Sequence, residues 1–514
     1  MNRHTNDANT SRQRRPMAFA DWFGIACLIL FGACSLILLI RLLTTKMLTS
    51  SLVTAVVIAL AVLNGLHFFV QLPRWKHLWP KIVCGIVALL LSGAMIYVSV
   101  AAGGVQSVLQ NISGKLVEKE TTYVIVRKDD PARDIGDTQD YRFGSLSHAD
   151  KKNTEALLQA VKDGLGRLNN TSYESILDLA DALYSNKVDA IMLNEGYIAM
   201  LEGMDGYHDF SQRTRILYEF TTEHEVQPIS PNSAITREPF VVYCSGIDAR
   251  STDMNIKSLS DGNILAVIHP ITRQILLINT PRDYYVPLVS EPFTGRLDKL
   301  THAGGLGIKE SMKVLGNLYG VDPTYYMRIN FQGLVDVVDA LDGIDVNSPQ
   351  AFTTTYIGVL ENGDECKYTF KKGPNHLNGH QALAYSRERQ AFEGGDNQRG
   401  QNQMAVISGI VDKATSREIL TRYDELFKAV EHCFITNMPY QDITSLVKMQ
   451  LRDMSKWNIT AYSVTGTADM QPCATIGTQD LWVMWPDKEG VETAKNLIQQ
   501  VMNGQAPVVP EKTN

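Results

Sequence analysis

Cysteine is scarce in this chain, with 7 residues among 514, and no two of them form a C-x-x-C pair. The spacing of Cys and His therefore excludes the usual structural zinc sites, and so few cysteines do not require a disulfide framework. Cys27, Cys34 and Cys84 lie in long apolar runs, where a thiol is a small apolar filler. Among the others, Cys433 and Cys473 are the pair that we favour for a disulfide, although sequence alone does not fix the connectivity.

Internal repeats and low-complexity segments are also absent. Hydrophobic residues make up 45% of the chain and charged residues 20%, which is ordinary for folded protein and excludes a wholly disordered or fibrous chain. A chain of 514 residues is long enough for about three to four domains.

Basic residues are too few in the main body for a general nucleic-acid binder. The formal net charge is −7, but residues 1–103 carry nine Lys and Arg against two acids, so the remainder holds 39 basic and 53 acidic residues. Nucleic-acid binding depends on a basic surface that neutralises phosphates, and we expect no nucleic-acid partner. Any anionic ligand must be bound by a local basic cluster.

Charged side chains are missing from three long N-terminal stretches, and each stretch contains an apolar run of about 20 residues, the length that crosses a bilayer as a helix. A cleaved signal peptide followed by buried helices fits less well, because two more apolar runs follow the first closely. Within residues 22–103 we predict three membrane spans, at 22–43, 50–71 and 82–102.

The basic residues around these spans predict their orientation. The N-terminal cluster at 11–15 and the loop at 74–81 are rich in Arg and Lys and would be cytoplasmic, whereas the short first loop is less basic and would lie outside. The tail at 1–21 is then cytoplasmic, and three spans put residues 103–514 outside. We expect a multi-pass protein of the cell membrane with a large extracellular part.

The outer part begins with a stretch that we interpret as a small α/β accessory domain over residues 112–226. Its apolar residues recur at strand and helix spacing, and it contains no catalytic constellation. A proline-containing segment at 227–239 is the predicted linker. The predicted strands are 121–126, 188–193 and 214–220, and the predicted helices are 157–165 and 176–183.

A larger α/β domain is predicted over residues 236–503, followed by a short polar tail at 504–514. Its apolar strands are continuous rather than alternating, which predicts a sheet covered by helices on both faces, an α/β/α sandwich. The predicted strands are 240–244, 263–269 and 273–279, and the predicted helices are 304–319, 331–341, 378–386, 398–415 and 417–432.

Polar residues gather where these strands begin or end. Asp248 and Arg250 follow the first strand, Asp261 precedes the second, and Arg282 follows the third. Ligands of open α/β sheets bind at strand ends, so this placement favours a site. Carboxylates such as Asp248 and Asp261 are the hard oxygen ligands that Mg²⁺ uses together with waters and substrate phosphates.

Arginines in later segments add permanent positive charge. Arg387 and Arg389 frame a glutamate, and Arg399 and Gln403 are four residues apart on a predicted helix, which puts them on one face. Several arginines and one metal suit a pyrophosphate, whose charge must be neutralised while a phosphoryl bond breaks. Taken singly, Asp248 is equally typical of a helix cap or turn, and the Arg387–Arg389 triplet is more typical of a solvated helix end than of an anion site.

Together the segments resemble the LytR–CpsA–Psr family of cell-surface transferases from Gram-positive bacteria. The resemblance covers about residues 240–415, and the N-terminal spans and small α/β unit are similar to the capsule-biosynthesis branch of that family. The motifs that carry it occur in the order GIDAR, SD, NTPRDYYVPL, DKLTHAGG, YYMRINF, VDALDGIDV, LNGHQALAYSRERQ and GGDNQRGQNQ.

The resemblance implies a phosphotransferase that attaches a glycopolymer, such as capsular polysaccharide or wall teichoic acid, to peptidoglycan from an undecaprenyl-pyrophosphate carrier. The implied partners are this donor, the peptidoglycan acceptor, the bilayer and other capsule-assembly membrane proteins. It implies Mg²⁺ or Mn²⁺ bound by Asp248 and Asp261, with these aspartates and Arg282 as catalytic residues. The implied pyrophosphate-binding residues are Arg250, Arg282, Lys299, Arg387, Arg389, Asp396, Arg399 and Gln403.

One departure from the family pattern concerns the residue before Ser260. The family commonly has Arg there and this chain has Leu259, so Arg250 and Lys257 are the candidates to replace that phosphate contact. The family also implies an apolar tunnel for the lipid tail of the donor, whose lining residues the sequence does not identify.

Other functions stay open at this point. A non-catalytic regulator of capsule synthesis could bind the lipid precursor and signal inward, although a cytoplasmic part this small leaves no room for a folded output domain. The chain could instead hydrolyse polyprenyl pyrophosphate without an acceptor. Attack at the anomeric carbon, rather than at phosphorus, would make it a glycosyltransferase.

Overall fold

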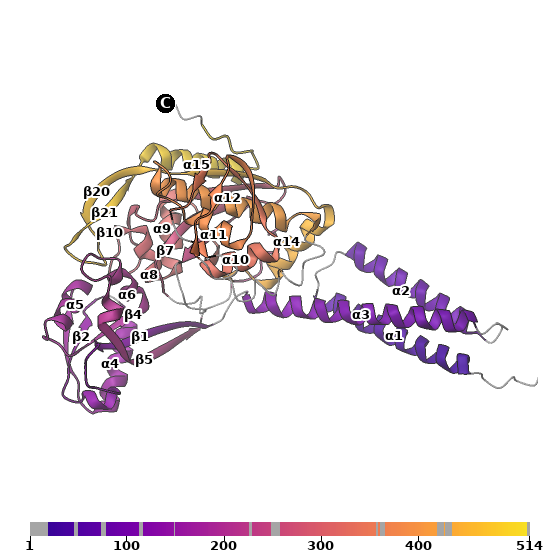
Figure 1. Cartoon of the computed structure of the whole chain (residues 1–514), viewed down its shortest axis with the longest axis horizontal. Coiled ribbons are helices and arrows are strands. Elements are labelled where there is room, and N and C mark those ends of the chain that lie inside the picture. The colour runs from indigo at the N-terminus through magenta and orange to yellow at the C-terminus, as the bar shows by residue number, and fades with distance from the viewer. Residues whose placement is uncertain are drawn as a thin grey trace, which may run out of the picture. The chain divides into compact units, whose positions relative to one another are not determined.

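The computed structural model describes residues 19–45, 50–72, 79–112, 117–148, 150–225, 229–247, 257–355, 358–359, 365–418, 426 and 434–510 (Figure 1). Asp248, Arg250 and Cys433 lie outside the described residues, as do most of the predicted cytoplasmic tail and of the predicted helix at 417–432. The chain divides into two compact units, Met1–Ser107 and Val108–Asn514, which are described separately.

The first unit contains three apolar helices: α1 (Phe19–Thr45), α2 (Ser50–Gln71) and all but the last residues of α3 (Trp79–Ile112). Their most apolar windows have mean hydropathies of 2.8, 2.2 and 2.3, so each is long and apolar enough to cross a membrane. They lie where the spans were predicted. Polar pairs join the helices: Lys81 of α3 donates to Asp21 of α1, and Asn64 of α2 donates to Ser35 of α1.

The second unit begins with a five-stranded sheet of order β3-β2-β4-β1-β5, and its residues 117–225 are called the accessory unit below. The predicted strands and helices are present, whereas β2 and β3 were not predicted because they are short and partly polar. The strands are β1 (Val117–Arg127), β2 (Arg142–Leu146), β3 (Asn169–Tyr173), β4 (Ala190–Asn194) and β5 (Thr214–Glu225). The helices are α4 (Lys151–Leu165), α5 (Ile176–Tyr184), α6 (Glu195–Glu202) and the short α7 (Phe210–Arg213).

A second, six-stranded sheet forms the larger part of this unit, in the order β18-β11-β6-β7-β8-β19. The pairs β6–β11 and β8–β19 are parallel, whereas β6–β7, β7–β8 and β11–β18 are antiparallel. The strands are β6 (Phe240–Ile247), β7 (Ser260–His269), β8 (Gln274–Asn279), β11 (Tyr325–Asn330), β18 (Phe434–Thr436) and β19 (Asn458–Ser463). The three predicted strands are confirmed as β6, β7 and β8.

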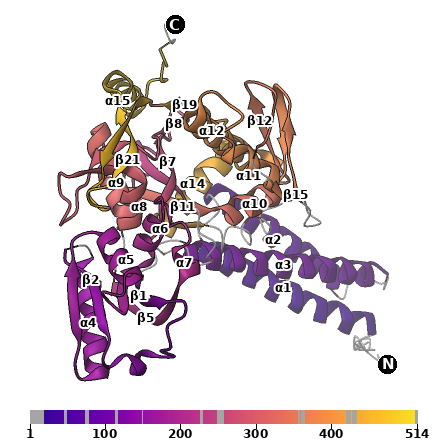
Figure 2. The same ribbon diagram turned by 60° about the vertical axis from the view of Figure 1, so that its left-hand side comes forward.

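Helices cover both faces of this sheet, as Figure 2 shows. On β6 and β7, side chains such as Val241 and Leu265 pack with α8, α9 and α15. Their neighbours Val242 and Ile264 face the other way and pack with α12 and α14. The predicted α/β/α sandwich is therefore confirmed. The helices are α8 (Leu300–Leu306), α9 (Ile308–Tyr319), α10 (Phe331–Ala340), α11 (Gly379–Arg387), α12 (Gly395–Ala414), α14 (Tyr440–Asp453) and α15 (Lys488–Met502).

The single helix predicted over 304–319 is wrong, because Gly307 separates α8 from α9. Its φ of 134° lies in a region that residues with a Cβ rarely adopt, so the helix cannot continue through it. Short two-stranded ribbons surround the main sheet: β9 (Tyr285–Pro287) with β10 (Leu297–Lys299), β12 (Ile344–Ser348) with β17 (Gly373–Leu377), β13 (Phe352–Thr353) with β16 (Thr369–Phe370), β14 (Gly358–Val359) with β15 (Glu365–Cys366), and β20 (Gly466–Pro472) with β21 (Asp480–Pro486).

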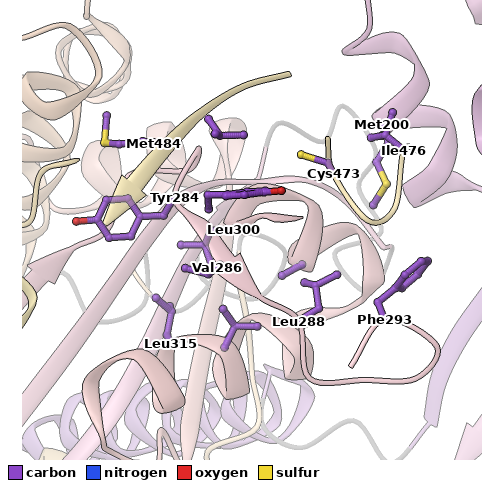
Figure 3. Close-up of a cluster of buried hydrophobic side chains, with 14 of the residues drawn as sticks. Met200, Tyr284, Val286, Leu288, Phe293, Leu300, Leu315, Cys473, Ile476 and Met484 are labelled. Carbon is purple, nitrogen blue, oxygen red and sulfur yellow. The ribbon is translucent and has the colours of Figure 1, made fainter. Parts of the chain in front are cut away.

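The accessory unit and the main sheet share one hydrophobic core. Met200 of α6 belongs to the same buried cluster as Leu300 of α8 and Ile476, which follows β20. Figure 3 shows part of this cluster. Its members Tyr284 and Val286 belong to the segment that follows the third predicted strand, β8. The two sheets therefore pack as one body, and the domain boundaries proposed from the sequence stay predictions.

We predict that Leu276→Ala destabilises the protein by about 3 kcal/mol, because Leu276 is fully buried in central strand β8 and its removal leaves a cavity. The measurement is chemical denaturation of the full chain. Ile271→Ala is the matched control: this side chain is 64% exposed in the turn between β7 and β8, and its loss should change stability by less than about 0.5 kcal/mol. Equal effects of the two substitutions would contradict the assigned core.

Candidate anion-binding site

A polar cavity of 560 Å³ lies at the ends of β7 and β8. Six of the ten residues predicted for the site line it, and they come from segments far apart in the chain. The lining residues are Asp261, Arg282, Phe331, Thr355, Arg387, Glu388, Arg389, Gln390, Arg399 and Gln403. The prediction that separate arginines meet at one place is confirmed for all four described arginines.

The sheet brings the first two of these residues together. Asp261 is the second residue of β7, and Arg282 follows the end of β8, the antiparallel neighbour of β7. The start of one strand therefore lies beside the end of the next. The Arg282 guanidinium donates from Nη1 to Asp261 Oδ1 at 2.7 Å.

Helices supply the other cations. Arg387 is the last residue of α11, and its guanidinium lies 4.2 Å from the centre of the Phe331 ring, a cation–π contact. Arg399 and Gln403 both line the cavity from α12, which confirms the shared face predicted from their spacing. Among the described residues, no carboxylate lies within ion-pair distance of Arg389.

Lys299 and Asp396, the other two described candidates, do not line the cavity but form ion pairs next to residues that do. Asp396 Oδ1 lies 2.7 Å from Arg399 Nη2, and Lys299 Nζ lies 3.0 Å from Asp283 Oδ1. Asp283 Oδ2 also lies 3.5 Å from Arg282 Nε. The carboxylates thus separate the cations, and they offset part of the repulsion between them.

The environment shifts the pKa values of three of these groups. Burial raises the pKa of Asp396 above its ordinary value, against the lowering effect of Arg399 and Arg282. Burial also lowers the pKa of Arg399. For Arg282 burial favours the neutral form, but the carboxylates of Asp261 and Asp283 outweigh it and raise the pKa, so this guanidinium stays charged.

Glu388 is a residue of this site that sequence reasoning did not select. Its side chain is buried, and its carboxylate accepts hydrogen bonds from the Thr355 hydroxyl at 2.8 Å and from the backbone N–H groups of Gln390 and Ala391 at 2.8 and 2.9 Å. These bonds fix the turn that carries Arg389. The Arg-Glu-Arg triplet was a visible signal, but the partner Thr355 is 33 residues away in sequence.

An apolar cavity of 310 Å³ adjoins the polar one and shares Phe331, Arg387 and Gln403 with it. Aliphatic side chains from β7, β11, α10 and α12 form most of its wall. They include Ile264, Met327, Ile329, Leu334, Val406, Ile407 and Ile410. The polar cavity therefore adjoins a space whose wall suits a hydrocarbon chain.

A divalent cation fits the residues on the polar side. Asp261 lines the cavity with its carboxylate partly exposed, and Mg²⁺ needs only one or two carboxylates when waters and phosphates complete its shell. Asp261 could thus hold Mg²⁺ or Mn²⁺ in exchange for its bond to Arg282. Asp248, the second predicted ligand, lies outside the described residues.

Asp298, His302 and Cys473 form a buried cluster that could suggest another metal site. Asp298 Oδ1 already accepts from the Lys299 N–H at 2.7 Å and contacts His302 Nδ1 at 2.6 Å, while Oδ2 accepts from the Thr475 N–H and hydroxyl, both at 2.7 Å. The carboxylate is therefore saturated, and the cluster is structural. Cys473 is a free thiol, so the predicted disulfide with Cys433 is wrong.

Lys257 does not replace the missing family arginine, which corrects the expectation from the sequence. Its Nζ lies 3.3 Å from Glu120 Oε1 and 3.5 Å from Asp150 Oδ1, both in the accessory unit, and it does not line the polar cavity. Leu259 packs against the shared hydrophobic core. Arg250, the other candidate, lies outside the described residues.

Comparison with known proteins gives consistent matches. The model of the LytR_cpsA_psr family matches residues 207–495. A protein of Bacillus licheniformis named polyisoprenyl-teichoic acid–peptidoglycan teichoic acid transferase TagU is 33% identical over 207 residues, which are 40% of this chain and 62% of that protein. The protein of the same name from Enterococcus faecalis is 32% identical over 241 residues, 47% of this chain and 74% of the relative.

The chain thus spans slightly less than two thirds of the B. licheniformis relative and about three quarters of the E. faecalis one. Among solved structures, Bacillus subtilis TagU matches with 26% identity and a TM-score of 0.38, over 53% of this chain and all of that chain.

We predict that Asp298→Asn destabilises the protein by about 3 kcal/mol at neutral pH, because it removes the charge that binds His302 and Thr475 in a buried network. Burial raises the pKa of Asp298, but His302 and Thr475 outweigh it, so the pKa is below its ordinary value. The ionised group therefore stabilises the fold above about pH 4, and this contribution is lost as the pH falls through the lower folded pKa.

Urea denaturation between pH 2 and 7 measures this effect. The substituted protein should lose less stability on acidification than the original. Asp480→Asn, at an exposed carboxylate, is the control and should follow the original curve. A parallel pH dependence of the Asp298→Asn protein and the original would refute the assigned role.

Proposed function

Because this chain belongs to the LytR–CpsA–Psr family, we propose that it is a membrane-anchored transferase that attaches a polyprenyl-pyrophosphate-linked glycopolymer to peptidoglycan. The observation that carries the proposal is the meeting of four arginines and two carboxylates, Asp261 and Glu388, on a cavity that adjoins an apolar one. This combination suits a ligand with an anionic head and a hydrocarbon tail. The relatives named above act, by their names, on polyisoprenyl-teichoic acid and peptidoglycan.

The arginines would bind the pyrophosphate of the donor. Arg389 has no carboxylate partner among the described residues, and Arg387 lines the same cavity from the end of α11, so both guanidinium groups are placed to donate hydrogen bonds to phosphate oxygens. Arg282 and Arg399 are held by Asp261 and Asp396 and would add charge as the phosphates displace part of that pairing. Guanidinium groups bind phosphate oxygens through two parallel hydrogen bonds, which also fixes the orientation of the head group.

Asp261 would hold Mg²⁺ or Mn²⁺, with Asp248 as the second ligand predicted from the sequence. The cation, when bound, supplies positive charge to the phosphate oxygens. The chain's own residues do the rest: the arginines stabilise the charge that develops as the bond breaks, and the aliphatic wall formed by residues such as Val406 and Ile407 orients the lipid.

In the proposed reaction, a peptidoglycan hydroxyl oxygen attacks the phosphorus next to the sugar. A new P–O bond forms, the bond to the second phosphate breaks, and polyprenyl phosphate leaves with the electron pair. The hydroxyl proton passes to a carboxylate, for which Asp248 is the candidate. The product is a glycopolymer joined to the acceptor by a phosphodiester.

The three apolar helices would keep the enzyme at the bilayer surface, where the lipid of the donor also resides. From the distribution of basic residues we propose a cytoplasmic N-terminus and an extracellular site. Capsular polysaccharide is the proposed polymer, with other capsule-assembly membrane proteins as partners, because the spans and accessory unit are similar to the capsule branch of the family.

We predict that Arg282→Ala lowers turnover at least about a hundredfold, because it removes a fixed charge that acts on the breaking bond. The assay follows glycan transfer from a polyprenyl-pyrophosphate donor to peptidoglycan by the full chain. Arg296→Ala, at an exposed arginine outside the cavity, is the control and should retain activity. Near-normal turnover after Arg282→Ala would exclude this arginine from the mechanism. Release of phosphate without an acceptor would instead identify a hydrolase, and binding without turnover a receptor.

We predict that Asp261→Asn raises the Mg²⁺ concentration for half-maximal activity about tenfold or more, because an amide is a weaker ligand than a carboxylate. Titration of MgCl₂ at saturating donor measures the change. Asp469→Asn, on the β20–β21 ribbon, provides a control carboxylate outside the cavity. An unchanged Mg²⁺ titration would contradict the assignment of Asp261 as the ligand.

A further inference from the structure

The accessory unit touches the two segments that carry Asp261 and Lys299. One contact is the ion pair of Lys257, four residues before Asp261, with Glu120 and Asp150. The other joins α6 of the accessory unit to α8, which starts directly after Lys299 (Figures 1 and 2). The described residues of the accessory unit contribute none of the side chains that line the polar cavity, so the unit can act on the proposed chemistry through contacts such as these.

The carboxylates that pair with Lys257 are held in place by hydrogen bonds within the accessory unit. Asn153 of α4 donates from Nδ2 to Asp150 Oδ1 at 2.8 Å and also donates to Glu120. Its own Oδ1 accepts from the Thr222 hydroxyl at 2.9 Å. Asn153 is 3% exposed, and the Lys257 side chain is 20% exposed. Two ordered, partly buried carboxylates form a specific binding site for one ammonium group. In this they differ from an exposed ion pair, whose side chains are mobile and which contributes little to stability.

The second contact is made by backbone against backbone. A Cβ on Gly196 of α6 would lie 2.4 Å from the carbonyl oxygen of Gly305 in α8, so the backbones of the two helices approach closely there, and the Met200 side chain of α6 also lies against Gly305. On its other side α8 presses on the segment before Asp261: a Cβ on Gly304 would lie 2.8 Å from the Ser260 nitrogen and 2.9 Å from the Ser258 carbonyl oxygen. The helix α8 is thus wedged between α6 and residues 258–260.

Ser260 is fixed from the sheet side as well. Its side chain is fully buried, and its hydroxyl lies 2.9 Å from the Tyr243 hydroxyl and 3.0 Å from Ser245 Oγ. Asp261 therefore follows a residue that the sheet holds on one side and the accessory unit, through α8, holds on the other. A displacement of about 1 Å at a group of this kind can cost a large part of the rate of an enzyme.

We propose that the accessory unit is a positioning element of the proposed transferase, and that Lys257 is a positioning residue that aligns Asp261 with Arg282 and Arg399. The inference rests on the proposed function for its catalytic consequence, but the structural part stands separately. Loss of the Lys257 contact would remove one of the two contacts by which the accessory unit holds residues 257–261, while Ser260 stays bonded to the sheet. The effect should therefore fall on the metal and pyrophosphate interactions of Asp261 rather than on folding.

The test compares Lys257→Met with the original full chain. Met keeps the length of the side chain and removes the charge that Glu120 and Asp150 bind. We expect the affinity for geranylgeranyl pyrophosphate in the presence of Mg²⁺, measured by calorimetry, to fall about tenfold. The affinity measured without Mg²⁺ should change little. We also expect faster amide hydrogen exchange at residues 258–263 in the ligand-free protein, and Lys257→Arg should restore both properties.

Arg142→Met is the matched control, because it removes an ion pair with Asp189 inside the accessory unit, away from α6 and Lys257. It should leave both measurements unchanged. Gly196→Ala tests the second contact without altering any charge, and it should increase exchange at residues 300–306 and 258–263.

The outcomes separate the inference from the proposed function. Unchanged exchange and unchanged Mg²⁺-dependent affinity in Lys257→Met would overturn the positioning role. An original protein that does not bind the pyrophosphate with Mg²⁺ would overturn the proposed function, and the exchange measurement would still decide the positioning role. Equal losses in Lys257→Met and Arg142→Met would show only general destabilisation and would also overturn it.

Discussion

The site depends on the repulsion between four guanidinium groups that share one cavity, and on how the protein offsets it without losing affinity for an anion. Asp261 neutralises Arg282 and Asp396 neutralises Arg399, whereas Arg387 rests on the Phe331 ring. These partners allow the cations to be close together. Each ion pair with a carboxylate also lowers the affinity of that arginine for an anion. The arrangement therefore favours a highly charged anion that can displace the carboxylate from the arginine, or an anion that binds together with a metal ion that the carboxylate can hold instead.

The sheet makes this arrangement possible because β7 and β8 are antiparallel neighbours. Ile264 pairs with Asn279, so the first residues of β7, among them Asp261, and the residues that follow Asn279 lie at the same end of the sheet. Packing on both faces fixes the register, since a shift of one residue would exchange the two hydrophobic cores. The stability of the fold and the geometry of the site therefore both depend on the register of β7 and β8, and mutations in these strands should affect both.

The sequence predicted those parts of the structure that depend on local pattern. Apolar runs predicted β6, β7 and β8, and four-residue spacing predicted that Arg399 and Gln403 share a face. Contacts between distant segments left no such signal: Glu388 depends on Thr355, and Lys257 on the accessory unit. A lysine that pairs with carboxylates more than a hundred residues away is indistinguishable in sequence from one that binds phosphate, because both need only a positive charge near the strand.

The Lys257 pairing also changes how the accessory unit is understood. The accessory unit shares a hydrophobic core with the main sheet, since Met200 and Leu300 belong to one buried cluster. Separating the two parts would therefore expose apolar surface to water, at a cost in free energy. A tethered domain that only brought the enzyme to a partner would need no such core. Burial at α6 and a charge pair at Lys257 instead act at two points on the segment that leads to Asp261, which is the arrangement expected of a part that sets the geometry of the site.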